Sequence, residues 1–178
     1  MSTDADGCGL APAFREVMAG VATPVAVVTG IEDGTPHGTT VSAFASLSMN
    51  PPMVLVALDR ASELLALIRR TRRFGVNVLG SDQADLAMRF ARKGGPGKFA
   101  GVPWETHAEV PRIPGAPGFL GCVVGGLAHG GDHLIVLGNV VAAESTGGPP
   151  LTYHDRRFGT HVPLDRGTAS RAAGDARR

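Results

Sequence analysis

The chain has 178 residues, of which 43% are hydrophobic and 19% charged, so we expect one globular domain with an ordinary core. A formal net charge of +1 gives no electrostatic reason to expect nucleic acid or an anionic membrane surface as a partner. The chain has no apolar run of the roughly 18–20 residues that cross a bilayer, no secretory-signal pattern at its start, and only two cysteines, so a cytoplasmic protein is expected.

Both ends of the chain are predicted to be disordered tails. Residues 1–9 are small and polar. Residues 164–178 are rich in Arg, Ala and Gly and have no large apolar side chain after Leu164. The folded domain is therefore expected to span residues 10–163.

The first elements alternate a helix with strands and turns. Phe14, Val17, Met18 and Val21 recur at helical spacing, which predicts an amphipathic helix. The β-branched run PVAVVTGI is followed by the turn cluster EDGTPHG, which predicts a strand, a turn and a second strand starting near Thr39. The run MVLVALD then predicts a buried strand.

Two helices and three strands are predicted further along the chain. Residues 62–73 predict a helix with Ser62 as its N-cap, and residues 81–93 predict another with a capping residue at its start. Strands are predicted over residues 74–80, 118–129 and 133–144, with a Gly- and Pro-rich loop before the second. Helices are too few for strict βαβ alternation, so the pattern indicates a closed or nearly closed antiparallel barrel with helices outside.

Hydroxyl side chains are concentrated between residues 39 and 48, at Thr39, Thr40, Ser42, Ser46 and Ser48. Small side chains let a flat ligand approach the backbone, and hydroxyls both donate and accept hydrogen bonds. An aromatic heterocycle with a polar edge, such as a flavin, would suit this surface. A Ser/Thr-rich strand at the edge of a sheet explains the same composition, so both interpretations stay open.

Two other stretches have the chemistry to bind phosphate. Ser62 caps a helix whose free N–H groups could meet an anion, and Arg60 precedes it. Lys93, Lys98 and Phe99 lie in or beside the Gly-rich loop, which could close over a phosphorylated ligand. An ordinary capped helix and solvated loop lysines account equally for these residues.

The stretch HGGDH places His129 and His133 four residues apart, a spacing that binds zinc on a helix. Gly130 and Gly131 lie between them and would cost a helix about 2 kcal/mol relative to alanine. The apolar run that follows predicts a turn entering a strand, with Asp132 capping the turn. No metal site is therefore expected here.

Six motifs occur in order over about residues 14–159: FREVMAGVATPVAVVT, GTTVSAFASLSMNPPMVLVAL, FGVNVL, RFARKGGPGKFAGVPW, GDHLIVLGNV and PPLTYHDRRFG. Together they resemble the flavin reductase-like family of FMN-binding split barrels. Its members are small reductase components of two-component flavin-dependent monooxygenases. The resemblance implies a mainly β fold, a six-stranded antiparallel Greek-key split barrel with flanking helices, and a homodimer with flavin sites near the subunit interface.

The resemblance also implies roles for individual residues. The segment that lines the isoalloxazine corresponds to Thr39, Thr40, Val41, Ser42, Ala43, Ser46, Leu47 and Ser48. Contacts to the phosphate and ribityl parts correspond to Arg60, Ser62, Lys98 and Phe99, while Val76 and Asn77 fall beside the ring. His133, in the GDH motif, is expected to face the nicotinamide.

The activity implied is reduction of FMN or FAD by NAD(P)H, with the reduced flavin passed to a partner monooxygenase. The difficult chemistry belongs to the cofactor, so the protein must stack and orient two rings rather than supply a nucleophile. A flavoprotein oxidase or oxygenase that retains FMN, and a non-catalytic FMN-binding module, are the alternatives.

Overall fold

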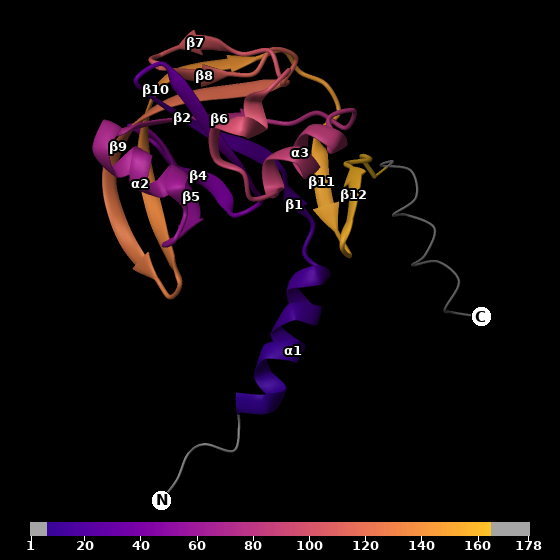
Figure 1. The fold of residues 1–178 in the computed structure, drawn as a ribbon. Coiled ribbons are helices and arrows are strands. Elements are labelled where there is room, and N and C mark those ends of the chain that lie inside the picture. Colours follow the sequence, from indigo (N-terminus) through magenta and orange to yellow (C-terminus); the bar gives the residue numbers. More distant parts are fainter. Residues whose placement is uncertain (1–6, 165–178) are drawn as a thin grey trace, which may run out of the picture.

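A seven-stranded antiparallel sheet forms the centre of the computed structural model, which describes residues 7–164 (Figure 1). In spatial order its strands are β3 (Thr35–Val41), β2 (Ala26–Glu32), β6 (Arg73–Val78), β9 (Gly118–Gly130), β10 (His133–Ser145), β5 (Pro52–Asp59) and β4 (Phe44–Met49). All neighbouring pairs in this sheet are antiparallel.

The sheet curls because its two edge strands are neighbours in the sequence. Strands β3 and β4 lie at opposite ends of the spatial order, yet only Ser42 and Ala43 separate them. Three extended residue steps span about 10 Å, so the edges must lie close together. The Ala57 N–H also donates to the Ala43 carbonyl (2.9 Å). The predicted mainly β antiparallel barrel is confirmed. The described sheet has seven strands, and the chain bends at Ser42 between β3 and β4.

Strand β2 separates two hydrophobic cores. Ala26 and Val28 face the core inside the barrel, which also contains Phe74. Val25 and Val27 point the other way, into a second core that includes residues of α3 (Ala84–Ala91) and η1 (Gly95–Phe99), whereas two buried leucines of α2 (Glu63–Thr71) belong to the first core. Side chains alternate across a strand, and this one is covered on both faces, which explains its near-continuous apolar sequence.

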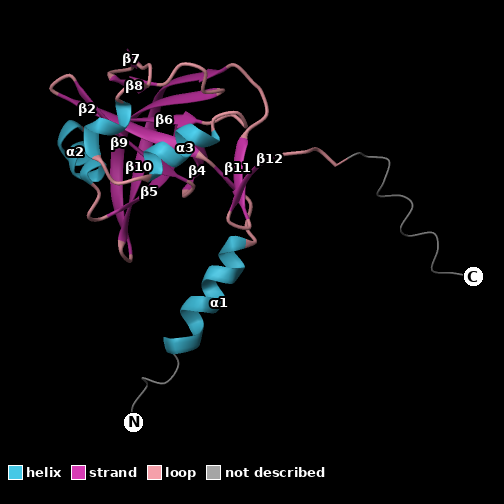
Figure 2. Ribbon diagram, turned by 45° about the vertical axis from the view of Figure 1, so that its right-hand side comes forward, coloured by secondary structure: helices cyan, strands magenta, loops and turns pink. Residues whose placement is uncertain are grey.

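Two α-helices and a short 3₁₀-helix cover the barrel (Figure 2). Helix α2 (Glu63–Thr71) buries its leucines and Ile68, and the Ser62 hydroxyl accepts from the Leu65 N–H (3.4 Å), so the predicted N-cap is confirmed. Helix α3 (Ala84–Ala91) begins later than predicted and has no side-chain cap. The predicted loop after it contains the 3₁₀-helix η1 (Gly95–Phe99).

Helix α1 (Gly7–Ala19) projects away from the barrel (Figures 1 and 2). It was predicted from its apolar spacing, but it ends before Val21 and its apolar residues are exposed, Phe14 by 62% and Val17 by 69%. Residues 7–9, predicted as tail, belong to this helix. Residues 1–6 and 165–178 of the predicted tails lie outside the described residues.

Two small sheets complete the described chain. Strands β1 (Thr23–Pro24), β11 (Leu151–His154) and β12 (Arg157–Thr160) form one of them. Strands β7 (Glu105–His107) and β8 (Val110–Arg112) form a hairpin. Over residues 7–164, no helix is both long and apolar enough to cross a membrane.

Candidate functional site

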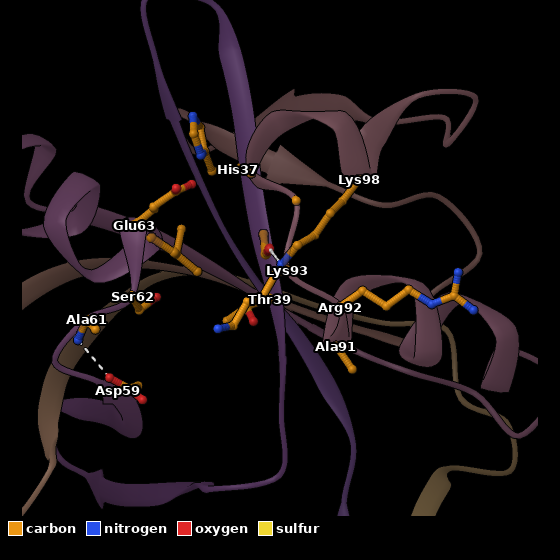
Figure 3. Close-up of a pocket in the computed structure, with 14 residues that line it drawn as sticks. His37, Thr39, Asp59, Ala61, Ser62, Glu63, Ala91, Arg92, Lys93 and Lys98 are labelled. Atoms are coloured by element: carbon orange, nitrogen blue, oxygen red, sulfur yellow. Dashed lines mark hydrogen bonds between the residues drawn. The ribbon is translucent and has the colours of Figure 1, made fainter.

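A hollow of about 410 Å³ opens where three segments meet (Figure 3). Residues 37–39 of β3 form one wall, the junction between β5 and α2 forms the second, and the segment from the end of α3 to Lys98 of η1 forms the third. A volume of several hundred Å³ is typical of small-molecule sites. The Gly94 and Gly95 backbones (φ 155° and 51°) adopt conformations that favour glycine and shape the third wall.

The junction at the second wall presents free backbone donors. The Asp59 carboxylate accepts from the Ala61 N–H (2.7 Å) and the Ser62 hydroxyl caps the helix. Within residues 7–164, the N–H groups of Glu63 and Leu64 donate to no protein acceptor. Both residues line the hollow, so the N-terminus of a nine-residue helix, with its positive end, faces the space.

Basic side chains also line the hollow. His37, Arg92, Lys93 and Lys98 contribute to the lining, and only Asp59 and Glu63 carry negative charge. Lys93 is exposed, and within the described residues it makes no hydrogen bond or ion pair. Free N–H groups beside flexible cations form a donor set that suits a phosphate group.

The side chains of β3 and η1 tie α3 to the barrel. The Thr40 hydroxyl donates to the Ala87 carbonyl (2.6 Å), and the Thr39 hydroxyl donates to the Phe90 carbonyl (3.5 Å). The Lys98 ammonium donates to the carbonyls of Gly38 and Phe90, both at 3.1 Å. Burial lowers the pKa of Lys98, and the nearby Glu63 carboxylate opposes that shift.

His133 stands beside the hollow at the tip of the β9–β10 hairpin. It pairs with Asp59 across β10 and β5, and Asp59 lines the hollow. The His133 Nδ1 lies 2.8 Å from Asp132 Oδ1, and the carboxylate can only accept, so Nδ1 carries the proton. Nε2 is then left to meet a ligand. The hydrogen bond from His133 also lowers the pKa of Asp132.

The same hairpin tip holds the other histidine of the motif. Turn residues Gly131 and Asp132 connect two strands, so His129 and His133 share no helical face. Among residues 7–164, no group of three or more His, Cys, Asp or Glu side chains is placed to hold a metal ion.

Three of the predicted cofactor residues line the hollow: Thr39, Ser62 and Lys98. Arg60 does not. Its guanidinium lies 2.5 Å from the His129 ring nitrogen and its N–H donates to the Asp132 carbonyl (3.0 Å). In this structure the Arg60 side chain contacts the hairpin tip and lies outside the hollow, and its expected contact with a phosphate stays a prediction.

Five other predicted residues are covered by protein. Val41, Val76 and Phe99 are buried in the two cores, Asn77 is buried among hydrogen-bond partners, and the hydroxyl of the partly buried Thr40 is bound to α3. Asn77 is 0% exposed, and its amide bonds β2 and the residues around β8. Their side chains have little or no free surface and a structural role in the described fold, and their expected contact with a flavin stays a prediction.

The rest of the hydroxyl-rich segment lies outside the hollow. Ser42, Ala43, Ser46 and Leu47 are exposed and Ser48 is partly exposed. The structure thus leaves this segment open to a ligand without placing it in the hollow. Sequence reasoning missed His37, Glu63 and Arg92 as lining residues; Glu63 could have been found from its position directly after the N-cap.

A model of the flavin reductase like domain matches residues 18–161. The 4-nitrophenol 4-monooxygenase/4-nitrocatechol 2-monooxygenase reductase component of Rhodococcus opacus is 43% identical over 150 residues, 84% of this chain and 80% of that protein. The FMN reductase (NADH) SmoA of Agrobacterium fabrum is 35% identical over 147 residues, 82% of this chain and 83% of its own.

The solved structures agree with these relatives. The NADH:FAD oxidoreductase SgcE6 of Streptomyces globisporus, in complex with NAD and FAD fragments, superposes with a TM-score of 0.79 at 31% identity. The match covers 84% of this chain and 92% of that one. The barrel, the matched domain and these relatives together show that the chain belongs to the flavin reductase-like family.

Proposed function

We propose that this protein is an NAD(P)H-dependent flavin reductase that supplies reduced flavin to a partner monooxygenase. The proposal rests on two neighbouring features of a chain that belongs to this family, a hollow and a histidine beside it. An electropositive hollow with free helix N–H groups lies beside a histidine whose Nε2 is available. The family match over residues 18–161 supports a single catalytic domain over most of the chain.

The hollow is assigned to the phosphate end of the flavin. The N–H groups at the start of α2 and the ammonium of Lys93 would hold the phosphate, and Thr39 lines the same space. The exposed segment from Ser42 to Ser48 is assigned to the ring, because small and hydroxyl side chains permit close approach and directional hydrogen bonds. When bound, the flavin supplies the chemistry by accepting hydride from the reduced nicotinamide.

His133 is assigned to positioning the nicotinamide. Asp132 holds the proton on Nδ1, so Nε2 can accept a hydrogen bond from the carboxamide of the nicotinamide. Orienting the two rings at near-attack distance is the task left to the protein. A cytoplasmic location fits dependence on reduced nicotinamide.

A homodimer is part of the proposal. The apolar stripe of α1 has no partner within the described chain, and Leu47 in the proposed ring segment and Met49 just after it are 45% and 85% exposed. Burying these side chains against a second copy would remove them from water. Sedimentation should show a dimer that Phe14→Asp weakens, while Arg15→Ala on the same exposed helix leaves it intact. An unchanged dimer in the first variant would remove α1 from the interface.

Steady-state kinetics test the function. Purified protein is assayed by nicotinamide absorbance with NADH and NADPH, each crossed with FMN, FAD and riboflavin. A reductase oxidises nicotinamide at a rate that rises with added flavin and saturates. Two relatives are named for different nicotinamides. SmoA is named for NADH, and a flavin reductase of Lentzea aerocolonigenes is named for NADPH. The second relative is 39% identical over 154 residues, which are 84% of this chain and 89% of that protein. A tight flavin complex without nicotinamide consumption would contradict the proposal and favour a binding module.

A further inference from the structure

Lys98 has contacts that differ from those of the other lysine at the hollow. Its ammonium donates to two backbone carbonyls, Gly38 of β3 and Phe90 of α3, both at 3.1 Å. Lys93, five residues earlier, is exposed and within the described residues bonds to no protein group. The two lysines therefore have different roles, although both line the hollow.

The two carbonyls bound by Lys98 have few other donors. Strand β3 is an edge strand of the central sheet, so one side of it has no neighbouring strand. Phe90 lies in the last turn of α3, where carbonyls have no intrahelical partner and the helix dipole is negative. A charged donor is stronger than a neutral one for both positions. The Thr39 hydroxyl also approaches the Phe90 carbonyl, at 3.5 Å.

The residue after Lys98 anchors the same segment by packing. Phe99 is buried and meets Phe90 edge-to-face, with ring centroids 4.8 Å apart. Gly38 lies against both rings, since a Cβ there would come within 2.9 Å of Phe90. Between these anchors and α3, the segment 93–97 contains three glycines and has little side-chain packing of its own. Its path over the hollow depends on the anchors at its end.

We propose that Lys98 is a positioning residue of the flavin site: its ammonium holds the glycine-rich segment 93–97 against β3 and α3, while Lys93 and the start of α2 meet the phosphate. This inference rests on the proposed function for the identity of the ligand. It assigns the two lysines separable effects on binding. If the segment is correctly placed only part of the time, the apparent affinity of the site for every ligand falls by the same factor.

Binding of riboflavin and FMN separates the two roles, because the two molecules differ only by the phosphate. Dissociation constants are measured by flavin fluorescence for the unmodified protein, Lys98→Met and Lys93→Met. Lys98→Met keeps the length of the apolar stem and should weaken riboflavin and FMN equally, by about tenfold. Lys93→Met removes the same charge from the same wall and should weaken FMN severalfold while riboflavin binding stays within about twofold.

A loss in Lys98→Met that is confined to FMN would overturn the proposal, because it would make Lys98 a phosphate ligand. Unchanged binding of both flavins would overturn it as well. Circular dichroism checks that the variants fold. If Lys98→Met does not fold, hydrogen exchange on the unmodified protein decides: without flavin, the amides of residues 93–98 should exchange more slowly than in an unstructured peptide. Exchange at the unstructured rate would refute a held segment. Nicotinamide oxidation by the unmodified protein is a separate measurement. Failure of the proposed function is therefore distinguished from failure of the positioning role of Lys98.

Discussion

Replacing Asn77 by alanine should destabilise the protein strongly and leave the chemistry of the site largely alone. Its side chain is 0% exposed. The amide nitrogen lies 3.3 Å from each of three acceptors, Val27 O, Thr29 Oγ1 and Pro111 O, which share its two protons, and Oδ1 accepts from the Ile113 N–H at 2.8 Å. These bonds join β2, β6 and the residues around β8.

The expected loss follows from the groups left behind. The buried Ile113 N–H would lose its acceptor, which costs about 1–3 kcal/mol. The Pro111 carbonyl would keep the Thr29 hydroxyl as a donor (2.7 Å), so the remaining hydrogen bonds add only about 1 kcal/mol. The total is about 3 kcal/mol, equivalent to a fall in Tm of about 10 °C for a chain of this length.

Urea denaturation followed by circular dichroism measures the free energy of unfolding. Asn139→Ala on β10 is the matched control, because that amide is partly exposed and, within residues 7–164, makes no hydrogen bond through its side chain. It should cost less than about 1 kcal/mol. A loss below about 1 kcal/mol in Asn77→Ala, together with a large rise in the flavin KM, would refute the structural role and support the expectation that Asn77 touches the ring.

Three further predictions concern His133 beside the hollow, Gly138 in the barrel core and the buried thiol of Cys122. His133→Ala should raise the KM for NAD(P)H severalfold and the flavin KM less; unchanged nicotinamide kinetics would remove its role. Gly138→Ala should cost about 2 kcal/mol in urea denaturation, because a Cβ would lie 2.4 Å from the buried Phe74 ring, whereas Gly9→Ala, with nothing within 4 Å, should be neutral or stabilising. Burial raises the pKa of Cys122 to about 12, so mass spectrometry should find that residue unalkylated at pH 8 in native protein and alkylated in urea; native alkylation would contradict the burial.

The sequence alone predicted the antiparallel barrel and most of its elements. These predictions rest on local patterns, such as the apolar spacing and Ser62 cap of α2, which act within a few residues of the chain. The glycines between His129 and His133 likewise excluded a helical zinc site, because a turn at Gly131 follows from local backbone preference. Ser62, predicted as that cap, also lines the hollow.

The tertiary structure decided which predicted residues can reach a ligand. Val76 and Asn77 alternate on one strand, and either face could have been open; both are covered, one by the barrel core and the other by the residues around β8. Arg60 binds His129, 69 residues away, and Lys98 binds Gly38, 60 residues away. Such contacts depend on strand register and on how the helices pack, which local sequence does not encode.

Residue types and their local spacing therefore determined the class of fold, the helix cap at the hollow and the family to which the motifs point. Closure of the barrel through Ser42 and Ala43 placed β3, α2 and η1 around one hollow. Only this arrangement distinguishes Lys93, which is free to meet a ligand, from Lys98, which binds the protein itself. The physical reason is that the role of a side chain depends on which groups the tertiary structure places within its reach. For Lys98 those groups are carbonyls from two distant elements of the fold.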